Sequence, residues 1–365
     1  MKILKEMRRK AFLLLLPLGM MLAYLASFFP DWVEKVYSNG FYRLIGQPLS
    51  RAMGWFPFSL AEMIIIVLTV QFFWRLIRFL TAGKRKGEGG LFPWLVKLLW
   101  AGGLIYFLFI MVWGLNYYRL PFARSANFSL EPFQLEELTE LCRDLIEQAN
   151  ELRNRVDQDE KGVMQVKGTK GNVFHRAEKG YARAAYTYPQ LSGEYGPPKG
   201  VFFLSKVMSY AGISGVYFPF TGEANINISV PDALLPSTVC HEMAHQRGFA
   251  REEEANYIAY LTSTLHPDPD FQYSGILLAL THSMNTLYKY DSAKYQELRR
   301  NYAEGVTRDL ADISAFWERY EGHLDKLSRK INDLYLKANR QKEGIFSYNR
   351  MVELLIAEYR MKKGK

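Results

Sequence analysis

Two histidines stand four residues apart near the middle of the chain, with a glutamate directly after the first. The segment 237–250 reads STVCHEMAHQRGFA and holds His241, Glu242 and His245 in the pattern HExxH. On a helix, residues four apart share one face, so the two imidazoles could bind one metal ion, and imidazole nitrogens suit Zn²⁺. Glu242 is rotated by about 100° around the helix axis. It would flank the ion, where a general base could take a proton from a metal-activated water.

A third ligand must come from outside this helix, because catalytic zinc sites commonly use three protein ligands and keep one position open. Gly248 stands where a left-handed glycine commonly ends a helix, and REEEANYIAYL then predicts a second helix. We expect Glu252 to be the third ligand, because Asn256 lies on the same helix face and could hydrogen-bond a ligand histidine. Glu253 and Glu254 remain alternative ligands.

The acidic triplet also has a purely structural interpretation. Acidic residues in a first helical turn are stabilised by the helix dipole and commonly face solvent, and we expect that role for Glu253.

Other residues could contribute to the site or simply to packing. A donor for the transition state would be needed, and Tyr210, Tyr217 and His282 are candidates, although an ordinary core or surface position explains each of them better. The two cysteines, Cys142 and Cys240, are expected to be buried thiols, with a disulfide as the alternative.

Three apolar stretches precede this region, at about 11–29, 56–74 and 93–114. Each has about the twenty residues that a helix needs to cross a bilayer. The first is too long for an export signal and lacks a clear cleavage site, so we expect a retained anchor. Glu62 and Lys97 lie near span ends, where a charged side chain can reach the interface.

The distribution of charge orients these spans. The net charge is +9, of which residues 1–10 carry +4 and residues 75–97 carry +5, so the rest of the chain is formally neutral. The positive-inside rule then places the N-terminus and the loop after the second span in the cytoplasm and the chain after about residue 117 outside it. We therefore expect a multi-pass cell-membrane protein with an extracytoplasmic C-terminal domain. Nucleic-acid binding is disfavoured, because topology already accounts for the basic residues.

The expected organisation is a membrane domain over 1–117 and a mainly α domain with a small β-sheet over 118–365. Apolar spacing predicts a helix over 130–156 with Ser129 as its N-cap, and a second over 173–190. Short β-prone runs follow, and helices then continue to the C-terminus. The runs are 200–205, 215–220 and 224–230, and the helices are about 236–247, 252–265, 270–288, 291–300, 306–340 and 347–362.

Two resemblances follow from these motifs. HEMAHQ followed by REEEAN resembles the gluzincin zinc metallopeptidases, which implies a zincin-like α+β fold with His241, His245 and Glu252 as ligands and Glu242 as catalytic base. Glu252 lies seven residues after His245, a shorter spacing than in many gluzincins. With WGLNYYRLPF and GVYFPFTGEANIN, the chain is also similar over nearly its full length to a bacterial family of membrane-anchored HExxH proteins of unproven activity.

The sequence therefore predicts a membrane-anchored zinc metallopeptidase that cleaves peptide or protein substrates with a zinc-activated water. The gluzincin resemblance further implies that residues 224–230 hold a substrate backbone as an added strand, with a purely structural strand as the alternative. Two other functions remain open: a non-catalytic, zinc-organised binding or sensor module, and a membrane scaffold in which HExxH is incidental. The oligomeric state is left open.

Overall fold

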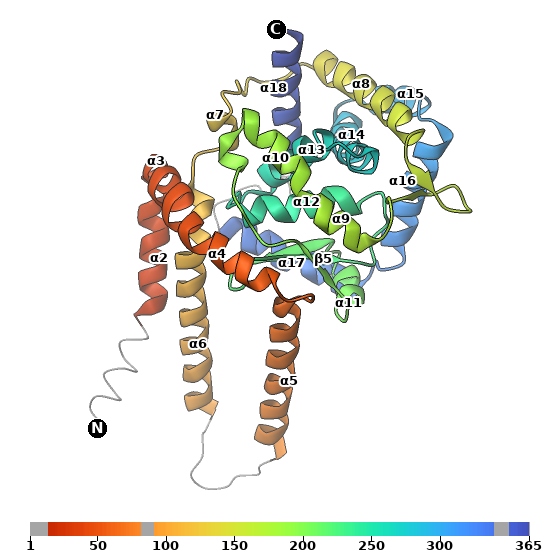
Figure 1. Cartoon of the computed structure of the whole chain (residues 1–365). Coiled ribbons are helices and arrows are strands. Elements are labelled where there is room, and N and C mark those ends of the chain that lie inside the picture. Colours follow the sequence, from red (N-terminus) through yellow and green to blue (C-terminus); the bar gives the residue numbers. More distant parts are fainter. Residues whose placement is uncertain (1–13, 82–90, 339–349, 365) are drawn as a thin grey trace.

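Three helices, α2, α5 and α6, project from one side of a mostly helical body in the computed structural model (Figure 1). Residues 14–81, 91–338 and 350–364 are described. The N-terminal elements are α2 (Leu15–Ala26), α3 (Pro30–Trp32), the π-helical η1 (Val33–Phe41), α4 (Tyr42–Gly54), α5 (Leu60–Thr81), α6 (Leu91–Val112), η2 (Gly114–Tyr118) and α7 (Phe122–Ser125).

Among the described residues, one helix is long and apolar enough to cross a membrane. A second candidate exists only if two helices joined by a sharp bend form a single span. The first is Leu60–Arg78, within α5. The second counts if α2 and the segment Pro30–Gly54, which meet at a bend of 100°, form one broken span. Leu99–Val112, the described apolar part of α6, is shorter. The structure thus supports one or two candidate membrane helices, where the sequence predicted three; residues 11–13 of the first predicted span lie outside the described residues.

The segment Pro30–Gly54, here called the N-terminal wall, packs against the body. The Tyr42 hydroxyl donates to the Gln246 carbonyl at 2.8 Å, and the Ser38 hydroxyl donates to Asn116 Oδ1 at 2.8 Å. Glu34 and Arg119 form a buried ion pair at 2.7 Å. The contacts of Tyr42 with Gln246 and of Glu34 with Arg119 therefore cross the predicted division at residue 117.

The body contains a three-stranded sheet in the order β3-β5-β4, formed by β3 (Lys199–Val201), β4 (Gly215–Phe218) and β5 (Glu223–Asn227). β5 is parallel to β3 and antiparallel to β4. Because β5 is paired on both sides, it cannot accept an added strand, and the predicted substrate-holding role of residues 224–230 is wrong. The edges of this sheet are β3 and β4.

The helices of the body surround a core in which α8, α12, α13, α14 and α18 pack together. The remaining elements are α8 (Leu135–Arg153), the hairpin β1 (Asp157–Gln158) and β2 (Met164–Gln165), α9 (Lys170–Arg176), α10 (Glu178–Thr187), η3 (Pro189–Leu191), α11 (Ser205–Tyr210), α12 (Leu235–Gln246), α13 (Glu252–Thr264), α14 (Pro269–Tyr290), α15 (Ser292–Arg299), α16 (Glu304–Glu318), α17 (His323–Ala338) and α18 (Met351–Lys363). The predicted mainly α class with a small sheet is confirmed.

Several local predictions need correction. α8 is capped by Gln134 in a capping box with Glu137, and Ser129 lies outside the helix. The predicted helix 306–340 is two helices, separated around Gly322, and a glycine is unfavourable inside a helix. The predicted helix 173–190 is likewise divided into α9 and α10. Cys142 and Cys240 are both buried free thiols, as expected.

Candidate metal centre

The HExxH helix, α12, ends in a turn that brings the chain back toward its own face. Gly248 has a φ of +81°, the left-handed region that favours glycine, and its N–H donates to the His245 carbonyl at 2.9 Å. A side chain here would also be crowded, because a Cβ would stand 3.0 Å from Asn116 Oδ1. After this turn α13 begins at Glu252 and packs against α12.

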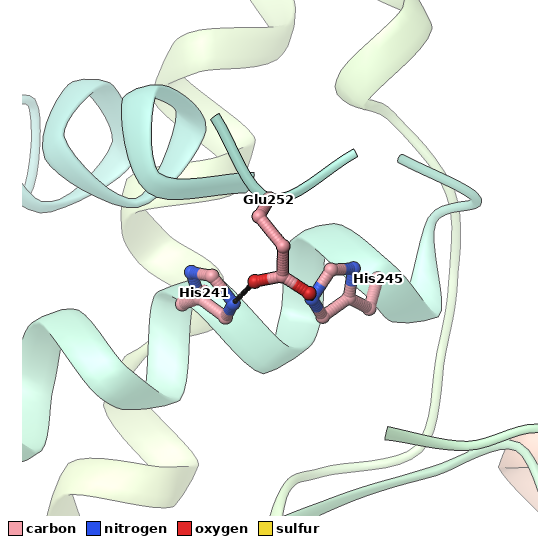
Figure 2. A group of neighbouring side chains, drawn as sticks. All are labelled: His241, His245 and Glu252. Atoms are coloured by element: carbon pink, nitrogen blue, oxygen red, sulfur yellow. Dashed lines mark ion pairs between the residues drawn. The ribbon is translucent and has the colours of Figure 1, made fainter. Parts of the chain in front are cut away.

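This turn brings His241, His245 and Glu252 together (Figure 2). His241 Nε2 lies 3.4 Å from one carboxylate oxygen of Glu252, and His245 Nε2 lies 3.6 Å from the other. One potential ligand atom from each residue lies within 4.8 Å of the others. In the described part of the chain this is the one group of three or more such residues that could hold a metal ion.

Hydrogen bonds orient both imidazoles. His245 Nδ1 lies 2.7 Å from the Phe249 carbonyl, so Nδ1 carries the proton and Nε2 presents its lone pair toward Glu252. Burial lowers the pKa of His245 to about 4, which keeps the ring neutral near pH 7 as a metal ligand requires. For His241, burial opposes protonation, but a hydrogen bond with Glu252, the charges of Glu242 and Glu252, and a hydrogen bond with Asn256 together raise its pKa. Asn256 thus contacts the histidine that it was expected to support.

Glu242 is buried beside this cluster, against the edge strand β4. Burial raises its pKa to about 8, the charge of His241 opposes that shift, and a hydrogen bond from the Tyr217 backbone opposes it further. Its Oε1 and Cγ pack directly on Gly215, the first residue of β4. Among the described residues, no group hydrogen-bonds Glu242 Oε2, although this atom is buried. A buried carboxylate oxygen without a protein partner is typical of a group that acts on a ligand.

The other two glutamates of the acidic triplet point elsewhere. Glu254 accepts hydrogen bonds from the Phe122 N–H at 2.9 Å and from Arg251 at 2.8 Å. Glu253 is only 8% exposed, so the prediction that it faces solvent is wrong. Burial raises the pKa of Glu253 to about 7, and the neighbouring charge of Glu254 adds to that shift.

The three candidates for a transition-state donor have different surroundings. His282, on α14, is close enough to His241 for their charges to interact; burial first, and then that interaction, lowers its pKa to about 4. The hydroxyl of Tyr217 is 3.1 Å from that of Tyr42. Tyr210 packs its ring against Tyr320.

Aromatic residues that the sequence did not single out surround the cluster. The Trp113 indole, just after α6, donates to the His245 carbonyl at 3.1 Å. Tyr335, on α17, receives a hydrogen bond from Tyr117 at 3.0 Å. Burial raises the pKa of Tyr335 to about 12, and the charge of Glu252 adds to that shift. The Tyr117 ring packs edge-on against Trp113, whose ring packs edge-on against that of His245, so these side chains connect Tyr335 to the cluster. Trp113 and Tyr117 belong to the stretch WGLNYYRLPF. The sequence showed this stretch as a motif but did not indicate that its residues lie beside the histidines.

Fold and site define a mainly helical protein in which an HExxH helix presents two histidines to a glutamate of the next helix. Over residues 37–356, the chain matches the family DUF3810, described as a protein of unknown function. The chain belongs to this family, and the match extends from the N-terminal wall through the cluster to α18. Comparisons with curated proteins and with solved structures gave no match.

Proposed function

We propose that this protein is a membrane-anchored zinc metallohydrolase that cleaves peptide bonds. The observation that carries the proposal is the convergence of His241, His245 and Glu252 within 4.8 Å, beside a buried Glu242. Two imidazoles and one carboxylate are a donor set found in catalytic zinc sites, which leave a position for water or substrate. The zincin-like character of the domain is part of this proposal.

Each residue has a separate task in the proposed reaction. His241, His245 and Glu252 would hold Zn²⁺, which when bound polarises a carbonyl and makes a water molecule more acidic. Glu242 accepts a proton and later returns it to the departing amine. Its contact with Gly215 and its hydrogen bond with the Tyr217 backbone fix the carboxylate in place. A base held in position contributes more to rate than one that must be ordered at each turnover.

We assign the donor for the developing oxyanion to Tyr335, with His282 as the alternative. Tyr335 is held beside the aromatic residues around the cluster, because its hydroxyl accepts a hydrogen bond from Tyr117 and its ring packs against that of Phe109. A hydroxyl that can donate to the substrate carbonyl stabilises the charge that forms only in the transition state. The hydroxyl of Tyr217, by contrast, is directed toward Tyr42.

The proposal includes the orientation in the membrane. α2, α5 and α6 would be three membrane helices, with the N-terminus in the cytoplasm and the body outside it. In Figure 1 the N-terminal end of α2, the C-terminal end of α5 and the N-terminal end of α6 all lie at the side away from the body. The basic segments of the sequence flank these same ends, as the positive-inside rule requires.

The test uses the full chain purified in nanodiscs. Zinc is quantified by mass spectrometry, and cleavage is followed with a fluorogenic peptide library. Glu242→Gln should abolish cleavage while zinc is retained, whereas Glu253→Gln, the neighbouring buried glutamate, should leave both unchanged. A wild-type protein that holds stoichiometric zinc but cleaves no peptide would contradict the enzymatic proposal and favour a zinc-organised binding module. Absence of zinc would contradict both.

A further inference from the structure

α17 carries an apolar stripe on its exposed side. Leu324, Leu327, Ile331 and Leu334 are 47%, 53%, 58% and 67% exposed. Their spacing of three and four residues places them along one helix face. Such a continuous stripe is unusual on a surface that meets only water. The exposed side chains of Lys326, Arg329, Lys330 and Lys337 lie on other faces of the same helix.

The position of α17 is fixed at both of its ends. Near its start, Asp325 lies next to Gly212, where a Cβ would stand 2.8 Å from Asp325 Oδ1. Near its end, the Tyr335 ring centre is 6.3 Å from that of Phe109, in the last turn of α6. Figure 1 shows α17 crossing the side of the body from which α5 and α6 project. The helix therefore lies at the level where α6 meets the body.

The first turn of α5 is held at the same side of the body. The buried Glu62 carboxylate accepts the N–H groups of Phe202, Phe203 and Leu204, at 2.6 to 3.1 Å. Phe202 and Phe203 are 60% and 73% exposed. Two large exposed aromatic side chains thus lie beside the start of the candidate membrane helix Leu60–Arg78.

Exposed apolar residues lie between the start of α5 and the start of α17. Val207 and Tyr210 are exposed on α11, which follows Phe203 directly. The Tyr210 ring centre is 4.9 Å from that of Tyr320, just before α17. An apolar belt therefore runs from α5 through α11 and along α17 to α6. We define it as Phe202, Phe203, Val207, Tyr210, Leu324, Leu327, Ile331 and Leu334.

We propose that α17 is an interfacial helix whose apolar stripe is buried in the surface of the lipid bilayer. This inference rests on the proposed membrane anchoring by α5. The belt begins beside the first turn of α5, and only 11% of the apolar window of this candidate membrane helix is buried in the protein, so one lipid surface covers both. Lys326 and Lys330 fit anionic headgroups at the same depth, as in other amphipathic helices that lie in the interface, whereas Arg329 and Lys337 pair with Asp325 and Asp333 of the same helix at 2.9 and 2.7 Å.

The substrate class follows from this placement. Tyr335, on α17, accepts a hydrogen bond from Tyr117, whose ring packs edge-on against that of Trp113, and the Trp113 indole donates to the His245 carbonyl. The metal centre therefore faces the membrane surface at the depth of the headgroups. Its substrates are peptide segments that lie on or emerge from the bilayer, such as the ends of membrane-spanning chains.

The experiment measures the depth of α17 in the full chain, without relying on activity. A single cysteine is introduced at Leu327 or Ile331, and at Lys326 or Lys330 as matched neighbours, and is labelled with a nitroxide. The native cysteines are buried, and the unsubstituted chain provides the labelling blank. Nanodiscs of phosphatidylethanolamine and phosphatidylglycerol are used, and collision rates with oxygen and with a water-soluble nickel chelate are compared.

The proposal predicts a severalfold higher ratio of oxygen to nickel-chelate collisions at Leu327 and Ile331 than at Lys326 and Lys330. High nickel-chelate accessibility at all four positions would overturn it. Dipolar broadening at Leu327 that disappears on dilution with unlabelled chain would also overturn it, because a second copy would then cover the stripe. The zinc content of the same samples is measured separately. A failure of the proposed lipid contact can therefore be distinguished from a failure of the proposed metal centre.

Discussion

Gly215 and Glu242 are in direct contact: the Cβ position of Gly215 is 2.6 Å from Glu242 Cγ and 2.7 Å from its Oε1. The glycine is required here by space, since its backbone is part of the regular strand β4. The strand edge thus forms one wall of the space that holds the proposed base. Any side chain at residue 215 must displace either the carboxylate or the strand.

Gly215→Ala should therefore lower peptide cleavage while zinc stays bound. A displacement of about 1 Å at a catalytic group can reduce the rate up to about 100-fold. Val216→Ala is the matched control, because Val216 is the next residue of the strand and is 42% exposed. The measurement is kcat/KM and zinc content for both variants. Equal activity in the two would contradict a role for this contact.

Glu252→Ala should remove zinc, whereas Glu253→Ala should retain it. Only Glu252 of the acidic triplet places its carboxylate between the two imidazoles. Zinc per chain after extensive dialysis against a weak chelator is the measurement. Retention of zinc by Glu252→Ala together with its loss in Glu253→Ala would reassign the third ligand.

Glu253→Gln should stabilise the metal-free protein at pH 8 but not at pH 5. Burial raises the pKa of Glu253 from 4.5 to about 7, so the folded state binds this proton more tightly than the unfolded state. The resulting stabilisation is complete below pH 4.5 and is lost as the pH rises through 7. Glutamine stays neutral, and we expect a gain on the order of 2 kcal/mol at pH 8.

Denaturant unfolding of wild type and variant at both pH values, with a chelator present, checks this prediction. A variant that is less stable than wild type at pH 8 would show that the carboxylate has a charged partner that outweighs its burial.

Arg247→Met should destabilise the body by about 2 to 4 kcal/mol. The Arg247 side chain is fully buried, is paired with Glu178 at 2.7 Å and donates to the Leu191 carbonyl at 3.0 Å. Its guanidinium also lies 3.8 Å from the Tyr181 ring centre. Arg183→Met is the control, because the hydrogen bond that Arg183 makes to the Leu265 carbonyl is exposed. Similar unfolding midpoints for the two variants would contradict this assignment.

The parts of the site that the sequence predicted are local along the chain. The spacing of His241 and His245 specifies one helix face, and Gly248 marks the turn that returns the chain to Glu252. The exposure of Glu253 was predicted wrongly because an acidic run in a first turn usually faces water, whereas here the body covers it. The residue pattern within one helix does not indicate which other elements pack against it.

The parts that the sequence did not predict depend on long-range contacts. Trp113 and His245 are 132 residues apart, and nothing in the spacing near Trp113 indicates its partner. No element was predicted for the N-terminal wall, which lies between the first two apolar stretches and is helical throughout. The small sheet was predicted from β-prone runs, but strand order is a property of pairing, which placed β5 at the centre.

The wall also has a consequence for how the chain is made. Tyr42 and its partner Gln246 are 204 residues apart, and α5 and α6 are synthesised between them. At a synthesis rate of roughly 5 to 20 residues per second, Gln246 is added to the chain roughly 10 to 40 seconds after Tyr42. During this interval the wall can already pack on residues 110–117, to which Tyr37 and Ser38 donate hydrogen bonds, so the later half of the body is added to a surface that the first half has already assembled.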